Sequence, residues 1–512
     1  MVSCYIDRLP DDLLCIIFEL ACEEDQATLS ETLQNNWDDS GDKEYYERGD
    51  AFPNDLSPPL APTAAAGVCE RWKSIFSQIS SMWTVLQISC REGAASLERA
   101  RTFLQHSGTH PLKITILWDN PSWIVSVLWN GTMPHKDQIK PTSRDEITAG
   151  VRLMLIIQEL YAHVHRWREF TLRTTSVAHT YQALSLISRP SVHPARMLEK
   201  LHLQLVHNER HAVHYVDEPS LFPGSASPIR DLVLFGISWA WPSSSILSSH
   251  LINLRFHYNA IMNEDWNDSS KQLEQLLGAL PNLQTLVLEP ELDTFDIDIT
   301  SIKLPNLHCL TIQSYSMGSW AVDFLQNVYM PNLRVLTLCG VTPDGNVGGI
   351  LDELARLTDS HAMESEEERS SCLLELDELH LLHFPYRGDL WPIHRLYTQM
   401  ASVKVLTLGP AAKDDNVAMA MGLLPSPFGR PDLPLPALQT LIVFDVPRRV
   451  MRNIVLERTP LAGPLEELYY QEEKDRSVPD DWKRQVERYH RIDCLKSRRY
   501  CDIVGRQWSY AA

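Results

Sequence analysis

The sequence lacks any long apolar run. No stretch approaches the roughly 18 consecutive apolar residues that a membrane-spanning helix needs, so we expect no membrane segment. Basic residues are also fewer than acidic ones: 46 Lys and Arg and 66 Asp and Glu give a net charge of −20. Neutralising phosphates and adhering to anionic lipids both need positive surface. We therefore expect neither a nucleic acid nor a membrane as a partner.

Patterned cysteines and catalytic motifs are also missing. The ten cysteines are scattered without a C-x-x-C pair, which suits reduced thiols and a cytoplasmic or nuclear location. No G-x-S-x-G elbow supplies a hydrolase nucleophile. His207, His211 and His214 fail the H-E-x-x-H zinc pattern, because Glu209 stands one position too late. We predict no catalytic residue, no metal and no cofactor.

What the chain does contain starts with two short amphipathic segments near its N-terminus. Pro10 and Asp11 favour a helix start, because proline fits the first turn and an acidic side chain suits the positive end of the helix dipole. Apolar residues then recur at nearly a helical period at Leu13, Leu14, Ile17, Phe18 and Leu20. A second segment, 64–83, has the spacing i, i+4, i+7 and i+8 at Val68, Trp72, Ile75 and Phe76.

An acidic stretch, 23–62, separates these two segments. It holds eleven acidic and two basic residues, a composition that buries little apolar surface. We interpret it as a tolerated surface insertion, the alternative being a contact for a basic partner. Two helices this short cannot build a core alone, so they must pack on each other or on a partner.

The order and spacing of these residues resemble the F-box, in the diverged form common in large fungal families. The residues that carry the resemblance are Leu9, Pro10, Leu13, Leu14, Ile17, Phe18, Val68, Cys69, Arg71, Trp72 and Trp83. The insertion departs from the family pattern, in which only a few residues join the two halves. An ordinary helical subdomain is the alternative reading of 4–90.

A different pattern fills the rest of the chain: an apolar residue, two others, an apolar residue, one other, and a third apolar residue. Ten such triplets recur at intervals of 22 to 43 residues. They are Leu198-Leu201-Leu203, Ile229-Leu232-Leu234, Leu251-Leu254-Phe256, Leu283-Leu286-Leu288, Leu307-Leu310-Ile312, Leu333-Leu336-Leu338, Leu376-Leu379-Leu381, Val403-Leu406-Leu408, Leu438-Leu441-Val443 and Leu465-Leu468-Tyr470. Three of them begin with nearly the same four residues: Leu-Pro-Asn-Leu at 280–283 and 304–307, and Met-Pro-Asn-Leu at 330–333.

Those intervals fit a strand plus a helical or irregular return, which is the plan of leucine-rich repeats. We predict an α/β fold in which an irregular leucine-rich-repeat-like solenoid with parallel strands follows the N-terminal helical module. Helix–strand units over 91–190 begin the array, 191–475 form its body, and 476–512 form a helical cap or, alternatively, a basic recruitment surface. A compact α/β domain is the alternative for the array.

The F-box resemblance implies a substrate-receptor subunit of an SCF-type cullin–RING ubiquitin ligase. It would bind a Skp-type adaptor, and through it a cullin, by Leu9, Pro10, Leu13, Leu14, Ile17, Phe18, Val68 and Trp72. In a solenoid, residues between the triplet positions face outward on the concave side. We expect a protein substrate to bind there, at His202, Phe235, Arg255, His257, Gln313, His380, Phe444 and Tyr469. The alternatives are a repeat scaffold that binds no ligase and, less favoured, an enzyme with an unrecognised site.

Overall fold

A computed structural model describes most of the repeat region and both halves of the N-terminal segment. The described residues are 9–21, 66–123, 143–205, 213–214, 221–223, 228–235, 237–238, 248–258, 273–290, 302–314, 319–340, 351, 354–355, 372–382, 386, 390–409, 413–425, 433–471 and 481–491. The chain divides into two compact units, the first running to Ser248 and the second being Ser249–Ser497. This division falls within the range 191–475 that the repeat pattern groups together.

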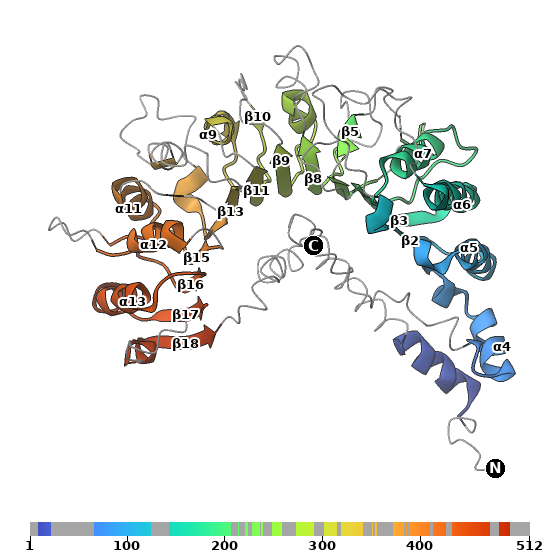
Figure 1. Ribbon diagram of the computed structural model, residues 1–512, viewed down its shortest axis with the longest axis horizontal. Coiled ribbons are helices and arrows are strands. Elements are labelled where there is room, and N and C mark those ends of the chain that lie inside the picture. The colour runs from blue at the N-terminus through green and yellow to red at the C-terminus, as the bar shows by residue number, and fades with distance from the viewer. Residues whose placement is uncertain are drawn as a thin grey trace. The chain divides into compact units, whose positions relative to one another are not determined.

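The first unit pairs helices with parallel strands. Residues 11–21 form its first described helix. The elements that follow are α4 (Glu70–Gln78), η3 (Ser80–Trp83), β1 (Val85–Ser89), η4 (Cys90–Glu92), α5 (Ala95–His106), β2 (Leu112–Trp118), η5 (Pro121–Trp123), α6 (Arg144–Tyr161), η7 (Val164–Arg166), β3 (Trp167–Thr174), α7 (Val177–Ile187), β4 (Lys200–Leu205), β5 (Val213–His214), β6 (Asp231–Phe235) and β7 (Ile237–Ser238). The strands run in the order β1-β2-β3-β4-β6, each parallel to its neighbour, with α5, α6 and α7 on one side of them (Figure 1).

The second unit continues the same plan. Its elements are β8 (Asn253–Tyr258), β9 (Thr285–Pro290), β10 (Ile302–Lys303), β11 (Cys309–Ser314), α9 (Ser319–Asn327), β12 (Val328–Tyr329), β13 (Val335–Gly340), η9 (Cys372–Glu375), β14 (Glu378–Leu382), α11 (Leu390–Gln399), β15 (Val405–Leu408), α12 (Lys413–Met421), β16 (Thr440–Val443), α13 (Arg448–Ala462), β17 (Leu465–Tyr470), η10 (Asp481–Gln485) and β18 (Val486–Arg491). The main strands follow the order β8-β9-β11-β13-β14-β15-β16-β17-β18, and neighbours are parallel. The predicted α/β class with parallel strands is confirmed.

The apolar triplets explain why these strands form and stack. The second and third members of every predicted triplet lie in a strand, from β4 to β17, and all three members are buried. The second and third members of neighbouring triplets are in register, as Leu310 with Leu336 and Ile312 with Leu338 show. Burying a leucine-sized side chain stabilises a fold by about 1.5–3 kcal/mol, so the triplets provide much of the core.

The residue before four of the triplets links one turn of the chain to the previous one. Asn332 Nδ2 donates a hydrogen bond of 2.6 Å to the Pro305 carbonyl, and Asn306 Nδ2 donates one of 3.0 Å to the Pro281 carbonyl. Asn282 stands in the same place and donates to the Ser249 carbonyl at 2.7 Å. In a later copy Ser402 replaces the asparagine, and its Oγ donates to the Leu374 carbonyl at 2.7 Å. These bonds explain why the sequence Pro-Asn-Leu recurs: its asparagine bonds to the backbone of the preceding repeat.

The structure also corrects parts of the prediction. Residues 486–491 form strand β18 beside β17, not a continuation of the expected helical cap. The sequence also predicts that 411–436, which holds five prolines, is a long excursion from the array, and the structure places helix α12 within it. The apolar spacing over 147–167 predicts a helix there, but the observed helix α6 ends at Tyr161 and the chain then enters η7. None of the described helices is long and apolar enough to cross a membrane.

Candidate docking surface

The two halves of the N-terminal module pack directly on each other. Leu14 and Phe18 lie one helical turn apart on the 11–21 helix, and both are buried. The Phe18 ring lies 4.7 Å from the Trp72 ring and 4.4 Å from the Phe76 ring, measured between centroids. These contacts make one apolar core from residues on either side of the insertion.

Hydrogen bonds also join the two halves of the module. Arg71 Nε donates to Asp11 Oδ1 at 2.9 Å, and Arg71 Nη2 donates to the Leu9 carbonyl at 2.5 Å. Cys69 caps the N-terminus of α4, since its Sγ accepts a hydrogen bond of 3.5 Å from the Trp72 backbone N–H. The Arg71–Asp11 pair is partly exposed, so it fixes geometry more than it adds stability.

The module is anchored to the first strand–helix repeat through Trp83. Its Nε1 donates to the Phe76 carbonyl at 2.7 Å, in a buried position. Its ring packs against Phe103 and His106 of α5, with centroid distances of 5.1 and 4.5 Å. The helices of the module are therefore held to helix α5 of the first unit by an aromatic contact.

A stripe of apolar side chains remains outside this core. Leu13, Ile16, Ile17 and Leu20 are 47, 52, 44 and 60% exposed. Their spacing i, i+3, i+4 and i+7 places them along one face of the helix, away from the face that carries Leu14 and Phe18. We call these four residues the apolar stripe. Covering them with a partner would contribute on the order of 1 kcal/mol per side chain.

The predicted adaptor-binding residues therefore divide into two groups. Leu14 and Phe18 belong to the internal core, while Leu9 and Trp72 are half-buried. Pro10, Leu13, Ile17 and Val68 are exposed. Sequence reasoning left out Ile16 and Leu20 as binding residues, although their positions three and seven residues after Leu13 place them on the same helical face.

The predicted substrate-binding residues divide similarly. His202 and Phe235 in the first unit, and Arg255, Gln313 and Tyr469 in the second, are half-buried on the strand face opposite the triplets. The His257 side chain lies outside the described residues, as do His207 and His211. The remaining two, His380 and Phe444, are 1 and 0% exposed, so the expectation that they face solvent is wrong.

Local contacts explain both corrections. Both ring nitrogens of His380 face neighbours on its own strand face: Nδ1 lies 2.8 Å from Thr407 Oγ1, and Nε2 lies 3.3 Å from Glu378 Oε2. Phe444 stands just past β16, which ends at Val443, and the next residue, Asp445, has a φ of 53°. Because the strand has ended, its alternation no longer directs the Phe444 side chain outward.

Charged groups line the half-buried positions. His202 Nε2 lies 3.2 Å from Asp231 Oδ1. Burial raises the pKa of the Asp231 carboxyl, but His202 and Lys200 outweigh it and leave that pKa below its usual value. In the second unit, the Tyr469 ring stacks on His490 at 4.4 Å and its hydroxyl donates to Glu467 at 3.1 Å. Burial, together with Glu467, raises the pKa of the Tyr469 hydroxyl.

The described residues hold no group of three His, Cys, Asp or Glu side chains arranged to bind a metal ion. No known protein-family model matches the chain, and no curated protein matches it. The geometry of the module and of the strands therefore carries the functional argument.

Proposed function

We propose that this chain is a substrate receptor of an SCF-type cullin–RING ubiquitin ligase. Its N-terminal module would bind a Skp-type adaptor through the apolar stripe, and its strand array, as a leucine-rich-repeat-like solenoid, would hold a protein substrate. The observation that carries the proposal is the stripe itself: four half-exposed apolar side chains on a helix whose other face is already packed. Such a face is the kind that a partner helix covers.

The location of the module supports the same proposal. Trp83 fixes α4 to the first repeat, so an adaptor on the apolar stripe would have a defined position relative to the sheet of the first unit. A receptor works by proximity: it holds a substrate lysine near a ubiquitin-charged enzyme and raises the effective concentration. No chemistry by this chain is required, and the cytoplasm or nucleus is the compartment in which such ligases act.

For the substrate, we propose the half-buried strand residues of each unit. His202 and Phe235 offer an imidazole and an aromatic ring in the first unit. Tyr469, stacked on His490, offers a rigid aromatic surface in the second. Rigid aromatic groups with charged neighbours are typical of protein-binding hot spots.

Co-purification with a Skp-type adaptor tests the proposal. The variant is Leu13→Asp/Ile17→Asp, which places two charges in the apolar stripe without touching Leu14 or Phe18. The matched control is Ile147→Asp/Val151→Asp, because these α6 residues are 51 and 58% exposed in the same unit. Adaptor binding that is lost in the first variant and kept in the second supports the receptor. A wild type that folds but binds no adaptor refutes it and favours the repeat scaffold.

A further inference from the structure

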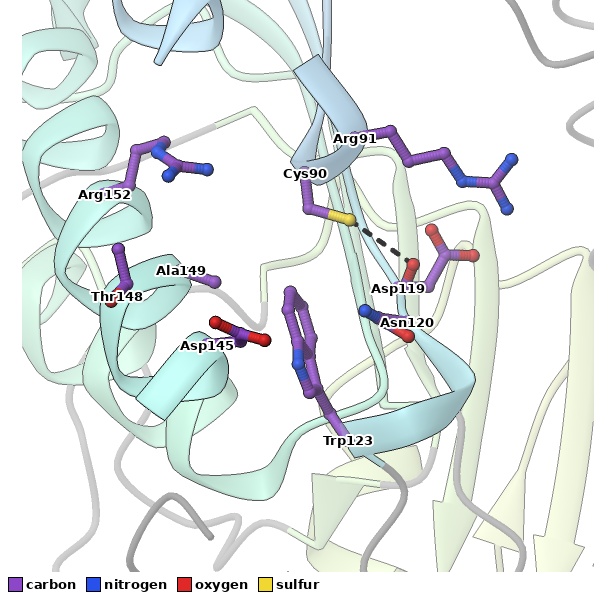
Figure 2. A pocket seen from close by; sticks show the side chains of 9 residues that line it. All are labelled: Cys90, Arg91, Asp119, Asn120, Trp123, Asp145, Thr148, Ala149 and Arg152. Atoms are coloured by element: carbon purple, nitrogen blue, oxygen red, sulfur yellow. Dashed lines mark hydrogen bonds between the residues drawn. The ribbon is translucent and has the colours of Figure 1, made fainter. Parts of the chain in front are cut away.

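The first unit contains a pocket of about 320 Å³ at the carboxyl ends of β1 and β2 (Figure 2). Cys90 follows β1 directly, and Asp119 and Asn120 follow β2. The opposite wall is the first part of helix α6. Ligands of open α/β sheets bind outside the carboxyl ends of the strands, so the pocket lies where such a fold accommodates them.

The α6 wall presents two opposite charges. Asp145, Thr148, Ala149 and Arg152 follow one another at helical spacing along this wall (Figure 2). Asp145 and Arg152 are two turns apart, or about 10 Å along the helix axis. Neither has an ion-pair partner among the residues that the structure describes. The wall therefore carries a carboxylate at one end and a guanidinium at the other, and no described residue neutralises either of them.

The facing wall holds Cys90, Arg91, Asp119 and Asn120, and Asp119 Oδ2 lies 3.4 Å from Arg173 Nε. Cys90 Sγ donates to the Asp119 carbonyl at 3.4 Å, and burial, with the Asp119 charge, raises the pKa of this thiol to about 12. Asn120 is held in place by two hydrogen bonds. Its Oδ1 accepts from the Ser122 backbone N–H at 3.0 Å, and its backbone N–H donates to Thr175 Oγ1 at 2.9 Å. The orientation of Asn120 leaves its Nδ2 group as a donor with no partner among the described residues.

Trp123 lies between the two walls (Figure 2). Its side chain is 5% exposed, and its ring meets His179 edge to face at a centroid distance of 5.0 Å. This contact fixes the indole, and an indole beside a carboxylate can stabilise a cation by both charge and cation–π attraction. Asp145 is the carboxylate on the Trp123 side of the pocket in Figure 2.

We propose that this pocket binds a basic amino-acid residue that has a free carboxylate. Arg152 would hold the carboxylate, and Asp145 with Trp123 would hold the cationic side chain. Free arginine or lysine has this chemistry, and so does a polypeptide that ends in arginine or lysine. The inference does not depend on adaptor binding, because none of these residues belongs to the apolar stripe.

Other ligand classes fit less well. A phosphate or another pure anion would pair with Arg152 but would meet the Asp145 carboxylate at the other end of the α6 wall. A lipid or an apolar ligand would leave charged side chains without water, which is costly. A ligand with separated opposite charges satisfies both ends of the α6 wall.

Calorimetric titration of the full chain tests the proposal with four probes: L-arginine, agmatine, which lacks the carboxylate, and a short peptide ending in arginine with a free or an amidated terminus. We expect L-arginine, the free-ended peptide, or both to bind. Removing the carboxylate from the probe, or changing Arg152→Gln or Asp145→Asn, should weaken binding at least about tenfold, because each loses a charge-assisted hydrogen bond. Arg144→Gln is the matched control, since Arg144 is exposed on the same helix α6 and does not line the pocket.

The two sources are distinguished by the probes. Binding of L-arginine alone identifies a free amino acid as the ligand, and binding of the free-ended peptide identifies a polypeptide terminus. The proposal is overturned if neither L-arginine nor the free-ended peptide binds at millimolar concentration. It is also overturned if Arg152→Gln and Asp145→Asn, with circular dichroism unchanged, bind as tightly as the wild type.

Discussion

Arg71 and Asp11 stand sixty residues apart in the sequence, and Arg71 Nε lies 2.9 Å from Asp11 Oδ1. The same guanidinium donates to the Leu9 carbonyl, so one side chain holds the start of the 11–21 helix against α4. Between these segments the chain carries the acidic insertion. The ion pair and the Phe18 contacts show that the two halves of the module meet despite that insertion.

Phe18→Ala should detach the 11–21 helix from α4. Phe18 is the residue of that helix that contacts both Trp72 and Phe76, and a buried Phe→Ala change typically costs about 3–5 kcal/mol. Hydrogen exchange of residues 11–21 should become fast while that of β2 and β3 stays slow. Leu20→Ala, at an exposed position, is the control and should change neither. Slow exchange of 11–21 in Phe18→Ala would contradict this packing.

Asn306→Ala should lower the free energy of unfolding by about 1 kcal/mol, because it removes the hydrogen bond to the Pro281 carbonyl. Asn306→Asp should cost more, since it removes the donor and places a negative charge beside that carbonyl. Denaturant unfolding of the full chain measures both values. Gln284→Ala, at an exposed position, is the control. Equal stability of all three variants would show that the asparagine bonds do not stabilise the stack.

The chain should lose stability as the pH falls below about 6.5, in part through His179. Burial lowers the pKa of the His179 imidazole, although the Glu146 carbonyl and charge oppose this. The unfolded chain therefore takes up a proton at this histidine at a higher pH than the folded chain does, and the loss continues until the folded pKa is reached. His179→Gln keeps a donor toward the Glu146 carbonyl but cannot titrate.

The comparison of the two proteins isolates this contribution from the other histidines. Between pH 6.5 and 5, the unfolding free energy of His179→Gln should fall less steeply than that of the wild type, by at most about 1.4 kcal/mol per pH unit. Parallel slopes would mean that His179 titrates normally in the folded chain.

Gly422→Ala should destabilise the second unit by about 1–3 kcal/mol through overpacking. A Cβ at Gly422 would lie 2.3 Å from Ile393 Cγ2, and Ile393 is fully buried in α11. Gly278→Ala is the control and should raise the stability slightly: a Cβ at Gly278 would meet no atom within 4 Å, Gly278 ends the helical residues 273–278, and alanine favours a helix. Thermal unfolding should separate the two variants. A Gly422→Ala protein as stable as the wild type would require room beside Ile393 that the structure does not show.

The stacked strands could be predicted from the sequence because one simple pattern produces them. A triplet such as Leu333-Leu336-Leu338 buries one side chain just before a strand and two on one side of it, and this burial outweighs any local preference. The strand β18 lacks the pattern: Val486 is buried, but Glu487 and Arg488 are exposed and charged. Its place beside β17 depends on the long-range pairing of Leu468 with Tyr489, which no local signal encodes.

The docking surface was predictable only in part. Helical periodicity gave the apolar positions of 11–21, but it could not tell which of them face α4, because that depends on the position of Trp72 and Phe76 in space. Phe18 and Ile17 are adjacent in sequence, yet one is buried and the other exposed. The pocket beside α6 escaped prediction for a similar reason: its walls come from segments that only the folded sheet brings together.

Complex formation between the full chain and a Skp-type adaptor is the most direct test of the central claim. The two purified proteins are mixed, and the molar mass of the product is measured by size-exclusion chromatography with light scattering. The receptor account predicts a one-to-one complex with the wild type and separate proteins with Leu13→Asp/Ile17→Asp. Separate elution of a folded wild type and the adaptor would contradict it.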